Sequence, residues 1–485
     1  MHHPALRRSL HGGLPLALAV LLLPLLPLAA FILFPDLFTK YIPFFEKSPP
    51  DLEFVQKPEA LGLGNNRLEL RVHDKGAGID EITVRAEQQG RSYDLFRQSF
   101  PRPKPLNQEV AIDFNPKELG MREDAVRIKA SVFDGSFWSN GAEEQFSSRI
   151  IYSRPRVEVL TSQHNVSQGG AGLVFYRIIS GEIRESGIRV GEKEFIGFPA
   201  SLLGQEFKSD PAVHFALFGV PKDFKSPPLK MQVFARDIGG NEALAPMYFR
   251  VRNVALRSAP IKLTTEFLAD KVPELLPKHF AEIGTQPPSN GNSSDPQALS
   301  EGFKVINESQ RAINDKRIRT ALKDTAKERL WEGTFNRAVM GSPTSSYGEQ
   351  RSYSFNGREI SRSSHDGIDL AAVANTVVRA ANSGRVVFAE ELGIYGNTVL
   401  IDHGFGLSTL YGHLSSITVA VGDRVAKDDQ IGRSGMTGLA GGDHLHFEVR
   451  LQGEPVTPIE WWDTRWIREH IDERILSMAA GSDGL

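Results

Sequence analysis

The stretch HLHFEVR, residues 444–450, places two histidines one residue apart in a run that otherwise has the pattern of a buried strand. Side chains two apart in a strand lie on one face, so His444, His446 and Glu448 point the same way. The intervening apolar residues Leu445 and Phe447 point the opposite way. The segment therefore predicts a strand with one face in the core and the other face carrying function.

Two further segments bring chemically active side chains into comparable settings. In LSTLYGHL, residues 407–414, His413 shares a strand face with Tyr411, which would turn this histidine toward the same cleft. In SSHDGIDL, residues 363–370, three residues that include a glycine separate His365 from Asp369. That glycine lets the chain curl so that both side chains reach one point.

Together these segments supply what a catalytic zinc site needs: three ligands of the His, His and carboxylate kind, an open position for water, and nearby imidazoles to handle protons. Six of the thirteen histidines lie after residue 360, and the chain has no cysteine, so histidines and carboxylates must hold any metal. We predict a structural or cleft-lining role for His403 in IDHGFG. For Glu448, which lies one strand repeat beyond His446, we predict a supporting or structural role rather than metal ligation.

The three segments resemble the signature of the lysostaphin-type (LytM-like) zinc metalloendopeptidases, which cut peptide cross-links of bacterial cell walls. The resemblance covers only the C-terminal domain. It implies that His365, Asp369 and His446 bind Zn²⁺ and that His413 and His444 are catalytic. No ligand or catalytic position is missing, unlike in degenerate family members that activate other wall hydrolases. An added stretch around residues 353–363 departs from the usual entry strand and would shape substrate access.

The expected activity is hydrolysis of peptide cross-links of peptidoglycan by a metal-bound water. His413 or His444 would accept its proton, and the other would stabilise the oxyanion or protonate the leaving amine. One alternative is a non-catalytic activator or scaffold for other cell-wall hydrolases, and another is an iron oxygenase with a two-histidine, one-carboxylate triad. A net charge of −3 and a pI near 6.5 give no basic surface for nucleic acid, so we exclude that partner.

The N-terminal region predicts a membrane anchor. Residues 14–34 form an uncharged apolar run long enough to cross a bilayer as a helix. Arg7 and Arg8 precede the run and no basic residue follows before Lys40, so the N-terminus should stay in the cytoplasm. We therefore expect a single-pass protein of the inner (cytoplasmic) membrane, with residues 1–40 as stub and anchor and the rest on the periplasmic or extracytoplasmic side. A cleaved signal peptide is the alternative.

Residues 51–254 alternate between apolar and polar residues in short runs broken by Gly, Asn and Pro, which predicts an all-β region. Similar landmarks recur about a hundred residues apart, as expected for two sandwich domains of the usual size. PDLEFV at 50–55 corresponds to PRVEVL at 155–160. We predict two immunoglobulin-like β-sandwiches, residues 51–153 and 154–254, which act as spacers or bind other envelope proteins.

Residues 259–283 and 298–329 have a helical pattern, so we predict a helical connector over residues 255–332. The connector either only links its neighbours or packs over the last domain and regulates it. Residues 333–463 return to short strands and predict the antiparallel β metallopeptidase domain. A charged helical tail, residues 464–485, ends the chain. The predicted fold class is thus a mainly β, multidomain protein with one N-terminal transmembrane helix.

Overall fold

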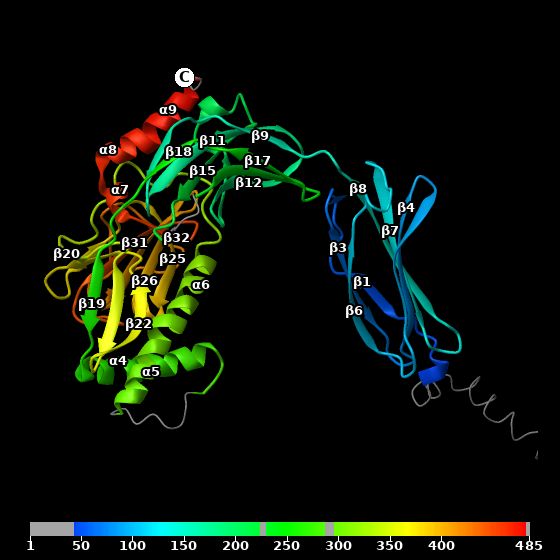
Figure 1. Cartoon of the computed structure of the whole chain (residues 1–485), viewed down its shortest axis with the longest axis horizontal. Helices are drawn as coiled ribbons and strands as arrows, with labels where there is room; N and C mark the ends of the chain where they lie inside the picture. The colour runs from blue at the N-terminus through cyan, green and yellow to red at the C-terminus, as the bar shows by residue number, and fades with distance from the viewer. Residues whose placement is uncertain (1–42, 224–228, 287–294, 482–485) are drawn as a thin grey trace, which may run out of the picture. The chain divides into compact units, whose positions relative to one another are not determined.

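The computed structural model describes residues 43–223, 229–286 and 295–481, so the predicted anchor at residues 14–34 lies outside the described residues. No helix within these ranges is long and apolar enough to cross a membrane. The described chain is mainly β, with few helices (Figure 1). It divides into two compact units. The first unit contains the residues up to Arg154 together with the short segment 237–241, and the second unit contains all other residues from Pro155 onward.

The first unit contains two sheets that face a common core, antiparallel throughout except for the parallel pairing of β2 with β8. Along strands such as β3, β6 and β7 buried apolar residues alternate with more exposed ones, and the buried residues meet in one cluster. One sheet has the order β1 (Asp51–Phe54), β3 (Asn66–His73), β6 (Asn107–Phe114). The other has the order β2 (Ala60–Leu61), β8 (Gly141–Ile150), β7 (Ala125–Asp134), β4 (Ile79–Gln88), β5 (Arg91–Ser99), and the 3-10 turn η1 (Pro43–Phe45) precedes them all.

The second unit begins with another pair of sheets. One has the order β14 (Phe198–Pro199), β15 (Val213–Gly219), β11 (Ala171–Ser180), β9 (Arg156–Val159). The other has the order β13 (Lys193–Ile196), β12 (Ile183–Val190), β16 (Met231–Asp237), β17 (Glu242–Pro246). β10 (His164–Ser167) pairs with β18 (Phe249–Arg252), and short 3-10 turns occupy Ala200–Leu202 and Gln205–Phe207. Two successive β modules are thus present, while their immunoglobulin-like topology and exact limits stay predictions.

The connector begins with a strand, where the sequence pattern predicted a helix from residue 259. β19 (Ser258–Lys262) pairs in parallel with β21 (Gln350–Phe355). Pro260 explains the difference, because proline disfavours a helical conformation in the residue before it and is tolerated in an edge strand. Helix α4 (Thr265–Glu282) starts only after Thr264, whose side chain caps the Phe267 amide. The remaining connector helices are α5 (Pro296–Val305), the π-helical turn Ile306–Gln310, and α6 (Arg311–Ala321).

An eight-stranded sheet follows, and the strand containing His446 lies inside it. β31 (Leu445–Leu451) runs antiparallel to β23 (Ile368–Ala371) on one side and to β27 (Leu407–Leu414) on the other. The sheet continues through β26 (Asn397–Gly404), β25 (Gly384–Glu391) and β29 (Arg424–Val425), with β20 (Ser342–Ser345) beside β23 and β32 (Glu454–Val456) beside β31. In one smaller sheet β22 (Arg358–Ser364) pairs with β21. Another has the order β24 (Val377–Arg379), β30 (Gln430–Arg433), β28 (Ser416–Ile417). The 3-10 turn Gly393–Tyr395 lies between β25 and β26.

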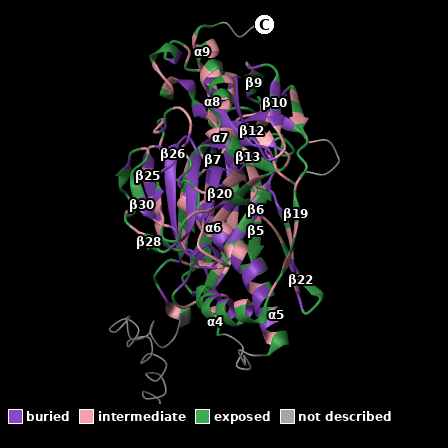
Figure 2. Cartoon of the chain, turned by 90° about the vertical axis from the view of Figure 1, so that its left-hand side faces the viewer, coloured by how far each residue is buried: buried purple, intermediate pink, exposed green. Residues whose placement is uncertain are grey.

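Both faces of this sheet are covered, so every residue of β27 and β31 is buried. Figure 2 shows purple, the colour of buried residues, along the strands around β26, the neighbour of β27. One face, with Tyr411 and Phe447, shares a core with the preceding β module and the C-terminal helices. The other face, with Leu400 and Leu410, shares a core with the connector helices α4, α5 and α6. The C-terminal helices are α7 (Pro458–Trp462), α8 (Thr464–Ile467), a π-helical turn (Arg468–Asp472) and α9 (Glu473–Ala479).

Candidate metal centre

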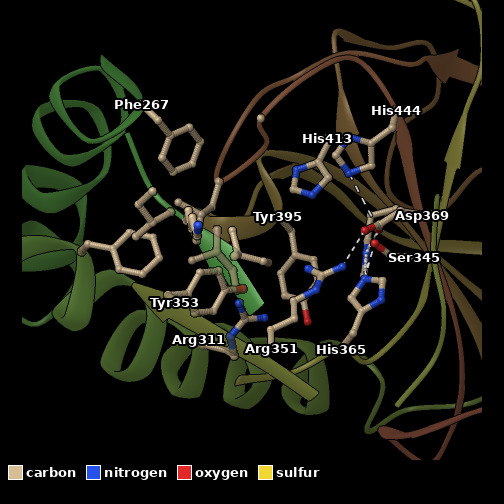
Figure 3. A pocket seen from close by; sticks show the side chains of 18 of the residues that line it. Phe267, Arg311, Ser345, Arg351, Tyr353, His365, Asp369, Tyr395, His413 and His444 are labelled. Atoms are coloured by element: carbon tan, nitrogen blue, oxygen red, sulfur yellow. Dashed lines mark hydrogen bonds and ion pairs between the residues drawn. The ribbon is translucent and has the colours of Figure 1, made fainter. Parts of the chain in front are cut away.

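The three predicted metal ligands converge at one buried point. Asp369 on β23 is the register partner of His446 on β31, and His365 lies in the turn just before β23. Oδ1 of Asp369 is 2.8 Å from Nδ1 of His446 and 3.1 Å from Nε2 of His365. The two imidazole nitrogens are 3.0 Å apart. Figure 3 shows the Asp369 carboxylate and the His365 ring facing each other at one end of a pocket.

Gly367, between His365 and Asp369, is required because a side chain would not fit there, and not because the turn needs an unusual backbone conformation. A Cβ atom at this position would lie 2.4 Å from the Phe447 carbonyl oxygen and 2.9 Å from Cε1 of His446. Real side chains do not tolerate such contacts, so only glycine lets the turn lie directly against β31. The close approach of two elements, and not the predicted freedom to curl, is therefore what requires a glycine here.

Hydrogen bonds fix which nitrogen each ring presents to the centre. Nδ1 of His365 donates to the Ser346 carbonyl at 3.0 Å, which leaves its Nε2 lone pair for the centre. Nε2 of His446 donates to the Glu448 carboxylate at 2.8 Å, which leaves Nδ1 for the centre. A ligand histidine held by a carboxylate or a backbone carbonyl in this way is the usual second layer of a metal site.

This donor set fits a zinc ion. Ligand atoms about 2.0–2.1 Å from a tetrahedral ion lie roughly 3.3 Å from one another, and the three atoms here need to separate by only a few tenths of an ångström. Arg351 donates to Oδ2 of Asp369 at 2.8 Å, so Oδ1 stays directed at the two rings. Burial alone would raise the pKa of Asp369, but the neighbouring imidazoles of His365 and His446 hold that pKa well below its usual value.

The electrostatics of the two predicted ligand histidines differ. Burial lowers the pKa of His365, which favours the neutral, metal-binding form. Burial acts the same way on His446, but the carboxylates of Asp369 and Glu448 outweigh it and raise the pKa of this imidazole to about 9. Two carboxylates around one imidazole thus favour a positive charge at this centre, and a bound metal cation can supply that charge in place of the proton.

The two predicted catalytic histidines lie beside this centre. The ring centroids of His413 and His444 are 4.8 Å apart, and that of His413 is 5.8 Å from His446. Each donates its Nδ1 proton to a backbone carbonyl at 2.8 Å, His413 to Thr437 and His444 to Gly442. Their Nε2 atoms therefore carry free lone pairs, and that of His444 is 3.7 Å from Oδ1 of Asp369.

His413 reaches the centre by a route that strand alternation does not predict. Tyr411 is paired with Phe447 on the core face of the sheet, so regular alternation would bury His413 there too. Between Tyr411 and Leu414, however, β27 has one residue more than β26, and His413 has a φ of +61°. A bulge of this kind re-aims a side chain, and here it turns the ring toward His444 and His446. The predicted proximity is found, but the predicted reason for it was wrong.

Glu448 supports the centre from within the sheet. It is fully buried, and its second oxygen accepts a 2.5 Å hydrogen bond from Nε of Arg450, which is also fully buried. Arg450 in turn donates to Asp315 of α6 at 2.8 Å. We did not predict roles for Arg450 or Arg351. Arg450 could have been found by continuing the strand alternation of His444, His446 and Glu448 by one step, whereas nothing local marks Arg351.

His403 is structural, as its sequence context suggests. Its ring is fully buried, with Nδ1 bonded to the Ser383 carbonyl at 2.7 Å and Nε2 to the Thr409 hydroxyl at 2.8 Å. Burial lowers the pKa of this imidazole to about 4. With both nitrogens paired and no place in the pocket lining, His403 belongs to the core.

The centre opens into a cavity of about 410 Å³ whose opposite wall comes from the connector and from the hairpin β21–β22. Phe267 of α4 and Tyr353 of the hairpin β21–β22 lie across the cavity from the histidines (Figure 3). The hairpin corresponds to the added stretch near residues 353–363. The connector therefore lines the pocket that contains the candidate centre, in addition to linking the β modules to the last domain. The remaining cavity residues from these elements are Ile261, Lys262, Leu263, Thr264, Phe303, Arg311 and Arg351.

Comparisons with known proteins agree with this geometry. Residues 363–458 match peptidase family M23. Over 95 residues, 20% of this chain and 22% of the relative, the sequence is 46% identical to the DD-carboxypeptidase/endopeptidase Mpg of Neisseria meningitidis. Over 96 residues, 20% of this chain and 22% of the relative, it is 40% identical to the peptidoglycan DD-endopeptidase ShyA of Vibrio cholerae.

A third relative has a different kind of name. Over 95 residues, 20% of this chain and 23% of the relative, the sequence is 39% identical to the murein hydrolase activator EnvC of Escherichia coli. All three matches thus span about a fifth of the length of this chain and of each relative. The His365, Asp369 and His446 cluster lies within the residues that match this family. Residues 363–458 form a peptidase family M23 domain, which confirms the predicted LytM-like resemblance.

Proposed function

We propose that this chain is a zinc endopeptidase that hydrolyses peptide cross-links of bacterial peptidoglycan. One observation carries the proposal: the donor atoms of His365, Asp369 and His446 lie within 4.8 Å of one another, with two further imidazoles beside them. In this assignment the three residues bind Zn²⁺, and His413 and His444 are the catalytic histidines.

Zinc held by such residues lowers the pKa of a bound water to about 7 and polarises a carbonyl group. The protein would supply the proton transfers. His413 is neutral at neutral pH because burial, reinforced by His444 and His446, holds its pKa well below the usual value. Its free Nε2, and that of His444, can accept a proton from the attacking water and return it to the leaving amine.

The substrate class is inferred from the relatives and from the shape of the site. Two relatives of the domain are named as endopeptidases, one of them as a peptidoglycan endopeptidase. The wall opposite the polar centre combines apolar and aromatic side chains with Lys262, Arg311 and Arg351, a lining that can orient a peptide. Stem-peptide cross-links are therefore the proposed substrate.

We also propose that residues 14–34 anchor the chain in the inner membrane and leave the domain on the periplasmic or extracytoplasmic side. The charge distribution around this segment supports the orientation. The two β modules would then separate the peptidase domain from the membrane or contact other envelope proteins. An enzyme placed in this way is on the same side of the membrane as the cell wall.

A second candidate function is activation of another cell-wall hydrolase. The similarity to the activator EnvC favours it, whereas the complete set of His365, Asp369, His413, His444 and His446 favours catalysis. The two functions predict different behaviour of the purified protein, because an activator does not itself release fragments from the wall.

Digestion of purified peptidoglycan tests both candidates. The full chain should release soluble muropeptides, a chelator should stop the release, and added zinc should restore it. Mass analysis of the fragments identifies the bond that is cut. His446→Ala should release nothing. If zinc-loaded full chain releases no fragments but increases release by a separate cell-wall hydrolase, the activator function replaces the enzymatic one.

A further inference from the structure

A second cluster of carboxylates lies in the first unit, far in sequence from the histidines. Glu46 follows the turn η1, Asp74 begins the loop between β3 and β4, and Asp134 is the last residue of β7. Oxygen atoms from the three side chains lie within 4.8 Å of one another. The residues are only 7%, 1% and 1% exposed, respectively. Three carboxylate groups are thus buried close together at one edge of the β-sandwich.

The hydrogen bonds of Asp74 leave one oxygen unpaired. Oδ2 accepts the amide protons of Gly76 at 3.1 Å and Gly78 at 2.5 Å. Oδ1 is completely buried and has no hydrogen-bond partner within the described residues. A carboxylate oxygen that is buried without a hydrogen-bond partner has lost its hydration without compensation, which is energetically costly. Such an oxygen therefore indicates a ligand that the described residues do not supply.

The other two carboxylates are held in place by their loops. Oδ1 of Asp134 accepts from the amide and the hydroxyl of Ser136 at 3.1 and 2.7 Å and from the Asn140 amide at 2.9 Å, and Oδ2 accepts from the Asn140 side chain at 2.8 Å. Oε2 of Glu46 accepts from the Ala77 amide at 2.9 Å, and Oε1 accepts from the Ser48 hydroxyl. These contacts orient the carboxylates without neutralising them. Among the described residues, Oδ2 of Asp134 and each oxygen of Glu46 accept a single hydrogen bond, so acceptor capacity remains on these atoms for a cation.

The described residues provide no ion pair that would balance this charge. None of the salt bridges between described residues joins Glu46, Asp74 or Asp134 to a lysine or arginine, and the nearby Lys104 is paired with Asp80. Burial raises the pKa of Asp74, and the charges of Glu46 and Asp134 add to that rise. Like charges therefore repel one another in a buried space, which is costly unless a cation or a proton is bound.

We propose that Glu46, Asp74 and Asp134 bind a calcium ion. The donors are hard carboxylate oxygens without histidine or sulfur, the set that suits Ca²⁺ and not zinc. Two oxygens bound to one Ca²⁺ at 2.3–2.6 Å lie no more than about 5.2 Å apart, so the observed spacing permits a shared ion. Because Glu46 precedes β1 while Asp74 and Asp134 follow β3 and end β7, the ion fastens the chain that enters this unit to the sandwich itself.

The test uses the zinc-loaded full chain in calcium-free buffer, titrated with CaCl₂ by calorimetry and followed by hydrogen exchange of peptides covering residues 74–78 and 134–140. One calcium per chain should bind. At ten times the dissociation constant, opening of these two loops should become about tenfold rarer and amide exchange correspondingly slower. Asp74→Asn should abolish both effects, and it should not lower the thermal midpoint in calcium-free buffer because it removes repulsion.

Asp113→Asn is the matched control, because this aspartate lies in the same unit on β6 with its side chain 58% exposed. It should bind calcium as the unaltered chain does. If Asp74→Asn fails to fold, Glu46→Gln takes its place, since this residue lies ahead of the first strand. The proposal is overturned if millimolar calcium leaves exchange of both loops unchanged in the unaltered chain, or slows it equally in Asp74→Asn or Glu46→Gln. A merely protonated cluster would give the first of these results.

Discussion

Glu448 and His446, two residues apart on β31, are joined by a 2.8 Å hydrogen bond inside the sheet. The same carboxylate pairs with Arg450, so one side chain orients a predicted metal ligand and balances a buried cation. This pairing holds the pKa of Glu448 well below its usual value although burial alone would raise it. Glu448 thereby fixes the orientation of the ligand ring and keeps Nε2 protonated, so that Nδ1 is the nitrogen left for a metal.

Glu448→Gln should therefore weaken both metal binding and the fold. Loss of a carboxylate behind a ligand histidine typically lowers metal affinity about 10- to 100-fold. Removal of one partner of a buried ion pair lowers the free energy of unfolding by about 3–5 kcal/mol. Arg450 keeps its contact with Asp315, so we expect a loss at the lower end of that range. Competition titration with a zinc chelator and urea unfolding measure the two effects. Glu328→Gln, 60% exposed, is the control and should change neither. Unaltered zinc affinity in Glu448→Gln would contradict the orienting role.

Substitution of the histidines should separate metal binding from proton transfer. His446→Ala should lose both zinc and activity. His413→Ala should keep most of its zinc, because the ring lies beside the three donor atoms, but lose about 10²- to 10⁴-fold in rate as expected for a proton-transfer group. Elemental analysis and hydrolysis of purified peptidoglycan give the two readouts. His73→Ala, an exposed position of the first unit, should leave both unchanged. Full zinc occupancy in His446→Ala would refute the ligand assignment.

Phe267 of α4 should restrict entry to the cleft. Its ring approaches Gly441 across the cavity, where an added Cβ would meet it at 4.0 Å. Phe267→Ala should raise kcat/KM on cross-linked peptidoglycan by about tenfold. The reason is that the substrate no longer has to displace the ring on entry, which removes a cost of about 1.4 kcal/mol. Phe280→Ala truncates the same residue type in the same helix away from the cavity and should not accelerate hydrolysis. A slower Phe267→Ala would instead assign the ring to substrate binding.

The buried His403 should make stability depend on pH. The unfolded imidazole gains a proton below its ordinary pKa near 6.5, whereas the folded one stays neutral down to about 4. The unfolded state therefore binds more protons in this window, and stability falls as the pH drops from about 6.5 to 4, by about 3 kcal/mol in total for this residue. Urea unfolding across this range measures the slope of the unfolding free energy against pH. In His403→Gln this slope should be smaller by the equivalent of about one proton. An unchanged slope would show that His403 does not titrate in this way.

Strand alternation in residues 444–450 placed His446 and Glu448 on one face because a two-residue period is a local property. His413 shows the limit of that reasoning, since its direction depends on an extra residue opposite β26 that only the paired strands reveal. Arg351 reaches Asp369 from a separate hairpin, and no local pattern predicts such a contact. β19 likewise replaces the start of a predicted helix because its pairing partner lies about ninety residues further along the chain.

The apolar face of the sheet that receives α4, α5 and α6 has a consequence for where this protein can be cut. A polypeptide shortened to residues 333–463 would keep all five histidine and aspartate side chains of the candidate centre. It would also uncover Leu400 and Leu410 on one side and Tyr411 and Phe447 on the other. Large exposed apolar surfaces favour aggregation. A fragment that stays soluble is therefore expected to extend beyond the residues that contain the candidate centre.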